Sequence, residues 1–128
     1  MIYLDTSVAL AHLLGEDLAP PTSLWDELLV SSRLLEYEMF TRLHARGLTR
    51  SHTAPARALL DRVALADMSV AVLGRALEPF PVALRTLDAM HLATILFLQA
   101  QGQAVRLATY DSRMGAVAQR LGIRLVDL

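Results

Sequence analysis

The chain opens with Met1-Ile2-Tyr3-Leu4-Asp5-Thr6-Ser7, a short apolar run that ends at an aspartate and continues into two hydroxyl residues. The apolar part, Ile2 to Leu4, predicts a buried strand with Asp5 at its carboxyl end. The aspartate and the hydroxyl residues provide turn and N-cap chemistry for a helix over about 6–14, which Gly15 would end. A strand that passes directly into a helix is typical of an α/β fold.

The same alternation continues along the chain. Further strands are expected at about 28–31, 63–68, 106–109 and 123–126, and helices at about 22–27, 33–46, 51–61, 69–77, 87–101 and 112–121. We therefore predict a single α/β domain over residues 1–128, in which helices flank a central, mostly parallel sheet of four to five short strands.

The composition limits the class of protein. At 128 residues the chain suits one domain with a single sizeable core, and no stretch approaches the ~20 apolar residues that a membrane helix needs. Because the first five residues lack a basic segment and already include a charge, we expect no signal peptide and a cytoplasmic location. The high hydrophobic fraction, 54%, indicates a dimer or partner contact, although a dense core alone could explain it.

The chain has no cysteine and no lysine, and all 12 basic residues are arginine. These absences exclude disulfides, thiolate metal sites, cysteine nucleophiles, a Schiff-base lysine and a P-loop lysine. A net charge of −1 gives no global field that would attract nucleic acid, so any RNA or DNA contact must use a local basic patch.

Two aspartates follow predicted strands. Asp5 closes the first strand, and Asp111 closes the apolar run 105–110. In an open parallel sheet, ligands bind beyond the carboxyl ends of the strands, which is where both residues would lie. Each could instead act only as a helix N-cap, although the neighbouring hydroxyl residues are available for that role.

Two further acidic residues fall on helices. Asp88 begins a helix that is apolar on nearly every side, so its carboxylate would lie close to the core; the alternative is an interaction with the helix dipole and Arg85. Periodicity does not decide between Glu36 and Glu38, and a surface pair of Glu38 with Arg42 is the alternative there. Carboxylates gathered by a fold repel one another unless a cation compensates, so a site for a divalent metal that acts on phosphate is the simplest account.

The order of these residues resembles the PIN-domain family of nucleases, and in particular the VapC-like toxins of bacterial toxin–antitoxin pairs. The matching pieces are Tyr3-Leu4-Asp5-Thr6-Ser7, the segment from Ser32-Arg33-Leu34 through Glu38 to Arg42, Leu84-Arg85-Thr86-Leu87-Asp88-Ala89-Met90-His91-Leu92-Ala93, and Ala108-Thr109-Tyr110-Asp111-Ser112-Arg113. The third piece is the most specific, and together the pieces span nearly the whole chain.

The resemblance implies a metal-dependent endoribonuclease toxin in which Asp5, Glu38, Asp88 and Asp111 bind Mg²⁺ or Mn²⁺ and hydrolyse RNA with metal-activated water. It selects Glu38 over Glu36, and it places Thr6 and Thr109 beside the metal ligands or the phosphate. It also implies a cognate antitoxin that covers the active-site groove, and a homodimer. The short, proline-broken segment 15–27 departs from the fuller helix of many relatives, which affects the expected shape of the substrate groove.

The remaining polar residues are interpreted from their positions relative to the acidic residues. His91 follows Asp88 by three residues, and we interpret it as a hydrogen-bonded core histidine rather than a catalytic base. A hypothesis for the arginines near the acidic residues is that they hold the RNA backbone; solvated helix faces and local ion pairs are the alternative for each. These arginines are Arg42, Arg46, Arg50, Arg85 and Arg113.

Three other classes compete with this interpretation. An inactive PIN-like domain that serves for binding or dimerisation would have no need of four acidic residues. A receiver-type phosphoacceptor domain would need a lysine, which the chain lacks, and a dehalogenase-type phosphatase would need a second aspartate two residues after Asp5. The sequence therefore favours the ribonuclease.

Overall fold

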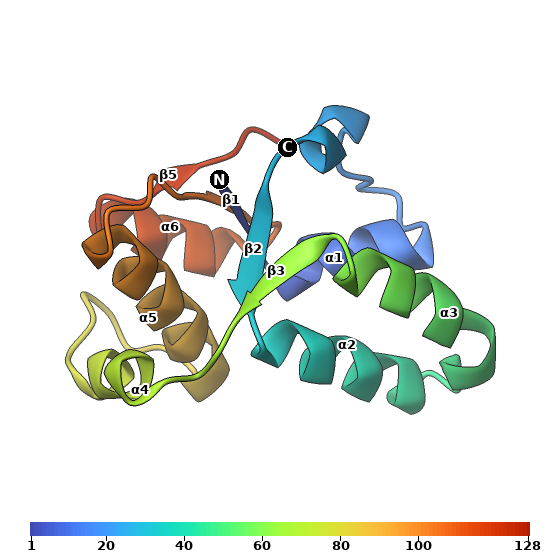
Figure 1. The fold of residues 1–128 in the computed structure, drawn as a ribbon, viewed down its shortest axis with the longest axis horizontal. Helices are drawn as coiled ribbons and strands as arrows, with labels where there is room; N and C mark the ends of the chain where they lie inside the picture. The colour runs from blue at the N-terminus through green and yellow to red at the C-terminus, as the bar shows by residue number, and fades with distance from the viewer.

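Five short strands form one sheet in the order β3-β2-β1-β4-β5 in the computed structural model, which describes all 128 residues (Figure 1). Every neighbouring pair is parallel, as expected. The strands are β1 (Ile2–Leu4), β2 (Leu29–Ser32), β3 (Val63–Ala66), β4 (Arg106–Ala108) and β5 (Arg124–Leu125). From β1 the chain builds the sheet outward to β3 and then returns to the other side of β1. The strand order therefore reverses between β1 and β4, the place where open parallel sheets bind ligands.

The strands are connected by helices and one 3₁₀ turn, η1. These elements are α1 (Thr6–Leu14), η1 (Thr22–Asp26), α2 (Leu34–Ala45), α3 (Thr49–Leu60), α4 (Val70–Leu77), α5 (Thr86–Ala100) and α6 (Ser112–Arg120). None of these helices combines the length and the apolar character that crossing a bilayer requires. In Figure 1, α1, α2 and α3 lie to one side of the strands, and α4, α5 and α6 lie to the other.

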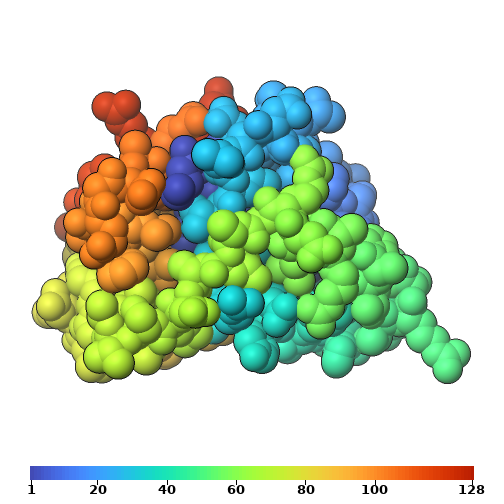
Figure 2. Space-filling view, viewed as in Figure 1, coloured from blue at the N-terminus to red at the C-terminus, as the bar shows by residue number.

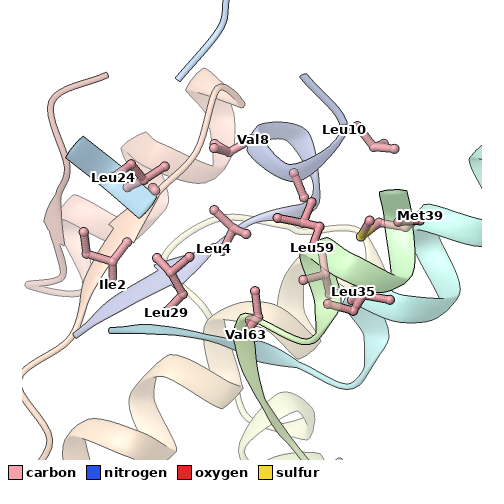
Figure 3. Packing of buried hydrophobic residues seen from close by; sticks show 14 of the residues in the cluster. Ile2, Leu4, Val8, Leu10, Leu24, Leu29, Leu35, Met39, Leu59 and Val63 are labelled. Carbon is pink, nitrogen blue, oxygen red and sulfur yellow. The ribbon is translucent and has the colours of Figure 1, made fainter. Parts of the chain in front are cut away.

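The alternation of side chains along β1 divides the core between the two faces of the sheet. Ile2 and Leu4 point into a cluster that includes Leu35 and Met39 of α2 and residues of α1 and α3 (Figure 3). Tyr3, between them, joins the second cluster, which α5 and α6 cover. The central strand is thus buried on both faces, and the two groups of helices converge at its carboxyl end.

The predicted elements all occur, and the ends that differ do so by one or two residues. One example is α3, which begins at Thr49 rather than at residue 51, so Pro55 lies well inside the helix. Helix α5 begins at Thr86, one residue before the expected start, and Arg85 is its N-cap residue. This shift places Asp88 at the third position of α5, where backbone N–H groups lack helical partners.

Candidate active site

Asp5 lies at the carboxyl end of β1, buried beside the point where the strand order reverses. It occupies the N-cap position of α1, yet its side chain makes no capping hydrogen bond. Its Oδ2 atom instead accepts hydrogen bonds from Ser7 Oγ at 2.6 Å and from Thr109 Oγ1 at 2.8 Å. The carboxylate is therefore held by side chains from two strand ends rather than used to cap the helix.

Asp111 and Asp5 are linked through Thr109, which follows β4. The Thr109 hydroxyl donates to Asp5 and accepts the backbone N–H of Asp111 at 3.0 Å. The Asp111 carboxylate does cap α6: its Oδ1 atom accepts the N–H groups of Arg113 and Met114 at 2.9 and 3.1 Å. The N-cap role therefore accounts for Oδ1 of Asp111 only, and Oδ2 makes no hydrogen bond.

Glu38, and not Glu36, lies at this end of the sheet. Its Oε1 atom accepts hydrogen bonds from Thr6 Oγ1 at 3.0 Å and from His91 Nε2 at 2.5 Å. Glu36 points to the other side of α2, where it forms an ion pair of 2.7 Å with Arg57. The alternative pair of Glu38 with Arg42 does not form. Periodicity did not decide between Glu36 and Glu38, and Glu38 is the one whose side chain lies at this end of the sheet.

His91 is buried and bonded at both ring nitrogens, which confirms the prediction of a hydrogen-bonded core histidine. Its Nδ1 atom lies 2.6 Å from the Tyr3 hydroxyl, and Nε2 meets Glu38. Burial alone would lower the pKa of His91, but the hydrogen bond to Glu38 and the charges of Glu38, Asp5 and Asp88 outweigh it and raise that pKa.

Asp88 reports the electrostatic state of the site. Its pKa is raised, first because burial disfavours the charged form and then because Asp111 and Asp5 repel its charge. His91 and Arg85 act in the opposite sense and do not cancel the repulsion. The fold therefore brings Asp5, Asp88 and Asp111 into one electrostatic neighbourhood, and His91 connects Glu38 to it.

The sequence model of the PIN domain family matches residues 2–126 of this chain. The chain belongs to the PIN domain family. It is also 31% identical over 129 residues to Ribonuclease VapC47 of Mycobacterium tuberculosis (strain CDC 1551 / Oshkosh), a match that covers 95% of this chain and 93% of the relative. The family expected from the sequence, and the parallel α/β fold that it implied, are both confirmed.

The PIN domain also uses residues that were not singled out from the sequence. Ser7 donates to Asp5 and accepts the backbone N–H of Tyr110 at 3.0 Å, so it ties the start of α1 to the loop after β4. Tyr3 contacts His91 and accepts the N–H of Ser32 at 3.1 Å. A signal for Tyr3 existed, because a tyrosine in a buried strand must find a partner for its hydroxyl group.

The arginines of this PIN domain fall into two groups. Arg113 donates to the backbone carbonyl of Ala83 at 3.0 Å and so fixes the loop before α5, and Arg46 lies 4.0 Å from Glu16 in a half-exposed pair. Arg42, Arg50 and Arg85 are exposed and form no ion pair. Among the five arginines named from the sequence, these three guanidinium groups are the ones free to meet a ligand.

The donor set of this PIN domain suits a hydrated divalent cation. No three carboxylate or imidazole side chains stand close enough together to form a ready-made metal cage. Mg²⁺ does not need such a cage, because it usually keeps several waters and binds one or two carboxylates. Burial and then the negative charges of Asp111 and Asp5 raise the pKa of Asp88, and a bound cation would oppose both effects. The carboxylates of this site therefore fit a hydrated divalent cation.

Proposed function

We propose that this PIN domain is a metal-dependent endoribonuclease toxin that hydrolyses RNA phosphodiester bonds and is inhibited by a cognate antitoxin. The observation that carries the proposal is the gathering of Asp5, Asp88 and Asp111 at the point where the strand order reverses, where burial and then the charges of Asp111 and Asp5 raise the pKa of Asp88. Uncompensated charge in a half-buried site is costly and is typical of functional sites rather than of structural ones. The similarity to a protein named as a ribonuclease supports the same class of reaction.

Asp5, Glu38, Asp88 and Asp111 would hold Mg²⁺ or Mn²⁺. When bound, the cation supplies Lewis-acid chemistry: it activates water as the nucleophile and offsets the charge that develops on the phosphate. The protein's share is orientation. Thr6, Ser7 and Thr109 each donate a hydroxyl hydrogen bond to one of these carboxylates, which leaves the unbonded oxygens free for the cation or the substrate.

His91 cannot act as a general base in this mechanism, because both of its ring nitrogens are already hydrogen-bonded. His91 Nε2 is engaged by Glu38 and Nδ1 by Tyr3, and the ring is 1% exposed. It therefore has no free nitrogen with which to take a proton from water at the phosphate. The chemistry rests on in-line attack by water: one P–O bond forms as the bond from phosphorus to the leaving nucleotide oxygen breaks, and the proton lost by the water is balanced by the proton that the leaving oxygen takes up from solvent.

The RNA strand would approach along a cleft beside Glu38. This cleft, of about 340 Å³, is lined by Thr6, Glu38 and Arg42 together with apolar side chains of α1, α2 and α5, among them Leu87. Arg42 and Arg85 would contact phosphates next to the acidic residues, which suits a protein whose net charge of −1 gives no global attraction for RNA. Arg113 would act indirectly, by holding the loop at Ala83.

The antitoxin and the second protomer would use different surfaces. We place the antitoxin over the acidic site, where it would block RNA. We place the homodimer contact on α4 and the loop after it, where Val70 and Leu77 are 89% and 88% exposed and Leu77 lines an apolar groove of about 510 Å³. Residues 67–85, yellow-green in Figure 2, form one corner of the molecule. Exposed apolar surface of this kind marks a protein contact.

The decisive experiment is cleavage of mixed cellular RNA by the purified protein with Mg²⁺ or Mn²⁺ and with EDTA, beside an Asp88→Asn variant prepared identically. Cleavage that requires metal and vanishes in the variant is the expected result. If neither protein cleaves RNA but Mn²⁺ raises the melting temperature of the wild type alone, the metal site is supported and the proposed RNA substrate is wrong. If Mn²⁺ has no effect on either protein, an inactive PIN-like binding or dimerisation module becomes the better description.

A further inference from the structure

The two carboxylate oxygens of Glu38 have different surroundings. Oε1 accepts both hydrogen bonds, from Thr6 on α1 and from His91 on α5, whereas Oε2 has no hydrogen-bond partner in the protein. The Glu38 side chain is 23% exposed, while that of His91 is 1% exposed. A buried, fixed imidazole therefore holds one oxygen of a partly exposed carboxylate and leaves the other oxygen open.

The direction of the bond from His91 does not depend on whether its ring is charged. The Tyr3 hydroxyl lies within hydrogen-bond distance of Nδ1 and can donate to it when the imidazole is neutral, which leaves the ring proton on Nε2. In the imidazolium form both nitrogens carry protons. In either form Nε2–H donates to Glu38 Oε1, because a carboxylate only accepts and would repel the lone pair that the other tautomer turns toward it.

We propose that Tyr3 and His91 are positioning residues that fix the rotamer of Glu38 and so reserve its Oε2 atom for the cation. The inference rests on the proposed function, since it assigns a reason for the geometry of one proposed ligand. Residues of this kind hydrogen-bond a metal ligand and fix its orientation. Their removal typically lowers metal affinity or activity about 10- to 100-fold.

Without this restraint, Glu38 has a competing partner. Arg42 lies four residues further along α2, the spacing at which glutamate and arginine pair on a helix surface, and its guanidinium is exposed and forms no ion pair. A glutamate released from His91 would be held by the Thr6 hydroxyl alone and would sample that pair and other rotamers more often. His91 thus keeps Glu38 at the acidic site and away from the helix surface.

The test compares Mn²⁺ affinity, measured by titration calorimetry, with the kcat and KM of RNA cleavage in four variants. His91→Leu removes the donor, His91→Gln retains an N–H donor, and Tyr3→Phe removes only the hydroxyl that bonds Nδ1 and holds the ring in place. His52→Leu is the matched control, because His52 lies on α3 and pairs only with Ser51. Mn²⁺ affinity or kcat should fall about tenfold or more in His91→Leu and Tyr3→Phe, less in His91→Gln and not in the control, with KM for RNA little changed.

A second comparison separates positioning from a general structural role. Glu38→Gln removes the charge that His91 holds, so adding His91→Leu to Glu38→Gln should cause no further loss of Mn²⁺ affinity, whereas two independent effects would multiply. Tyr3→Phe keeps the ring in its packing, so this variant still reports if His91→Leu proves unstable. Variants that fold and bind Mn²⁺ as the wild type does, while Glu38→Gln does not, would overturn this inference alone. A wild-type protein that neither binds Mn²⁺ nor cleaves RNA would overturn the proposed function and this inference with it.

Discussion

Thr109 and Asp5, 104 residues apart in sequence, are joined by a hydrogen bond of 2.8 Å from Thr109 Oγ1 to Asp5 Oδ2. The same hydroxyl accepts the backbone N–H of Asp111. One threonine therefore connects the carboxyl ends of β1 and β4 and sets the position of two acidic residues. Because a hydroxyl can donate one hydrogen bond and accept others, a threonine or serine is well suited to this position.

Replacing Thr109 with valine should keep the shape of the side chain and remove both hydrogen bonds. We expect RNA cleavage to fall about tenfold, because Asp5 loses one of its two orienting donors while its charge remains. Thr109→Ser retains the hydroxyl and should retain most of the activity. The measurement is the initial rate of cleavage at saturating Mn²⁺, and equal rates in the valine and serine variants would show that the hydroxyl has no part in orienting Asp5.

Two substitutions of Asp111 should separate its capping role from its charge. Asp111→Ala removes the acceptor that satisfies Arg113 N–H and Met114 N–H, and should cost about 0.5–2 kcal/mol of unfolding free energy. Asp111→Asn keeps an acceptor of similar capping strength, so its stability should stay close to that of the wild type. Both variants lose the charge and should lose cleavage. A stable but inactive Asp111→Asn, measured by urea unfolding and RNA cleavage, is the diagnostic result; full activity would reduce Asp111 to a cap.

The sequence predicts the fold well because the residues that begin and end its helices and strands act locally. The apolar run 2–4 forms β1, and Gly15 ends α1 with φ 61°, a conformation that favours glycine. Asp5 and Asp111 could be placed in advance because parallel strands end at the same edge of the sheet. Element ends were less accurate, as α3 shows, since the residues flanking Thr49 carry no side-chain capping signal.

The contacts inside the site could not be predicted in the same way, because they join distant segments. Ser7 and Tyr3 take part through hydrogen bonds to residues after β4 and on α5, and no local pattern gives those distances. Glu36 and Glu38 are two residues apart on one helix, so their opposite directions depend on how α2 packs. Arg113 could not be separated from the free arginines until its bond to Ala83 was visible.

The raised pKa of Asp88 makes a prediction about pH. The folded protein binds a proton on Asp88 more tightly than the unfolded chain does, so this contribution to stability is fully present below pH 3.8 and is lost as pH rises through the raised pKa. Asp88→Asn has no such loss. With EDTA present, its melting temperature should exceed that of the wild type at neutral pH, and the two should converge toward pH 3.8.

The control for this measurement is Asp17→Asn, in an exposed loop after α1, which should show no such pH-dependent difference. A melting temperature that is lower in Asp88→Asn than in the wild type at neutral pH would mean that the Asp88 charge stabilises the helix start. In that case the dipole of α5 and Arg85 would outweigh the repulsion from Asp5 and Asp111.

The free arginines predict how RNA binding responds to salt. Arg42→Ala and Arg85→Ala should each weaken binding of RNA of any sequence and reduce the salt slope of the affinity by about one. Arg50→Ala is a matched control, because Arg50 is equally free but lies on α3, away from the cleft at Glu38. The measurement is RNA affinity between low and physiological salt, made with the inactive Asp88→Asn protein as background. An unchanged slope in both variants would exclude these arginines as phosphate contacts.

The exposed face of α4 predicts the oligomeric state. Leu77→Asp should convert a dimer into a monomer, because it places a charge on the rim of an apolar groove whose lining contains no charged residue. Leu28→Asp is the matched control: Leu28 is 75% exposed just before β2, outside this groove, and its replacement should leave the dimer intact. Multi-angle light scattering would give both masses. A dimer that survives Leu77→Asp but is lost in Leu28→Asp would move the contact to the other end of the sheet, and α4 would then be free to bind a different partner.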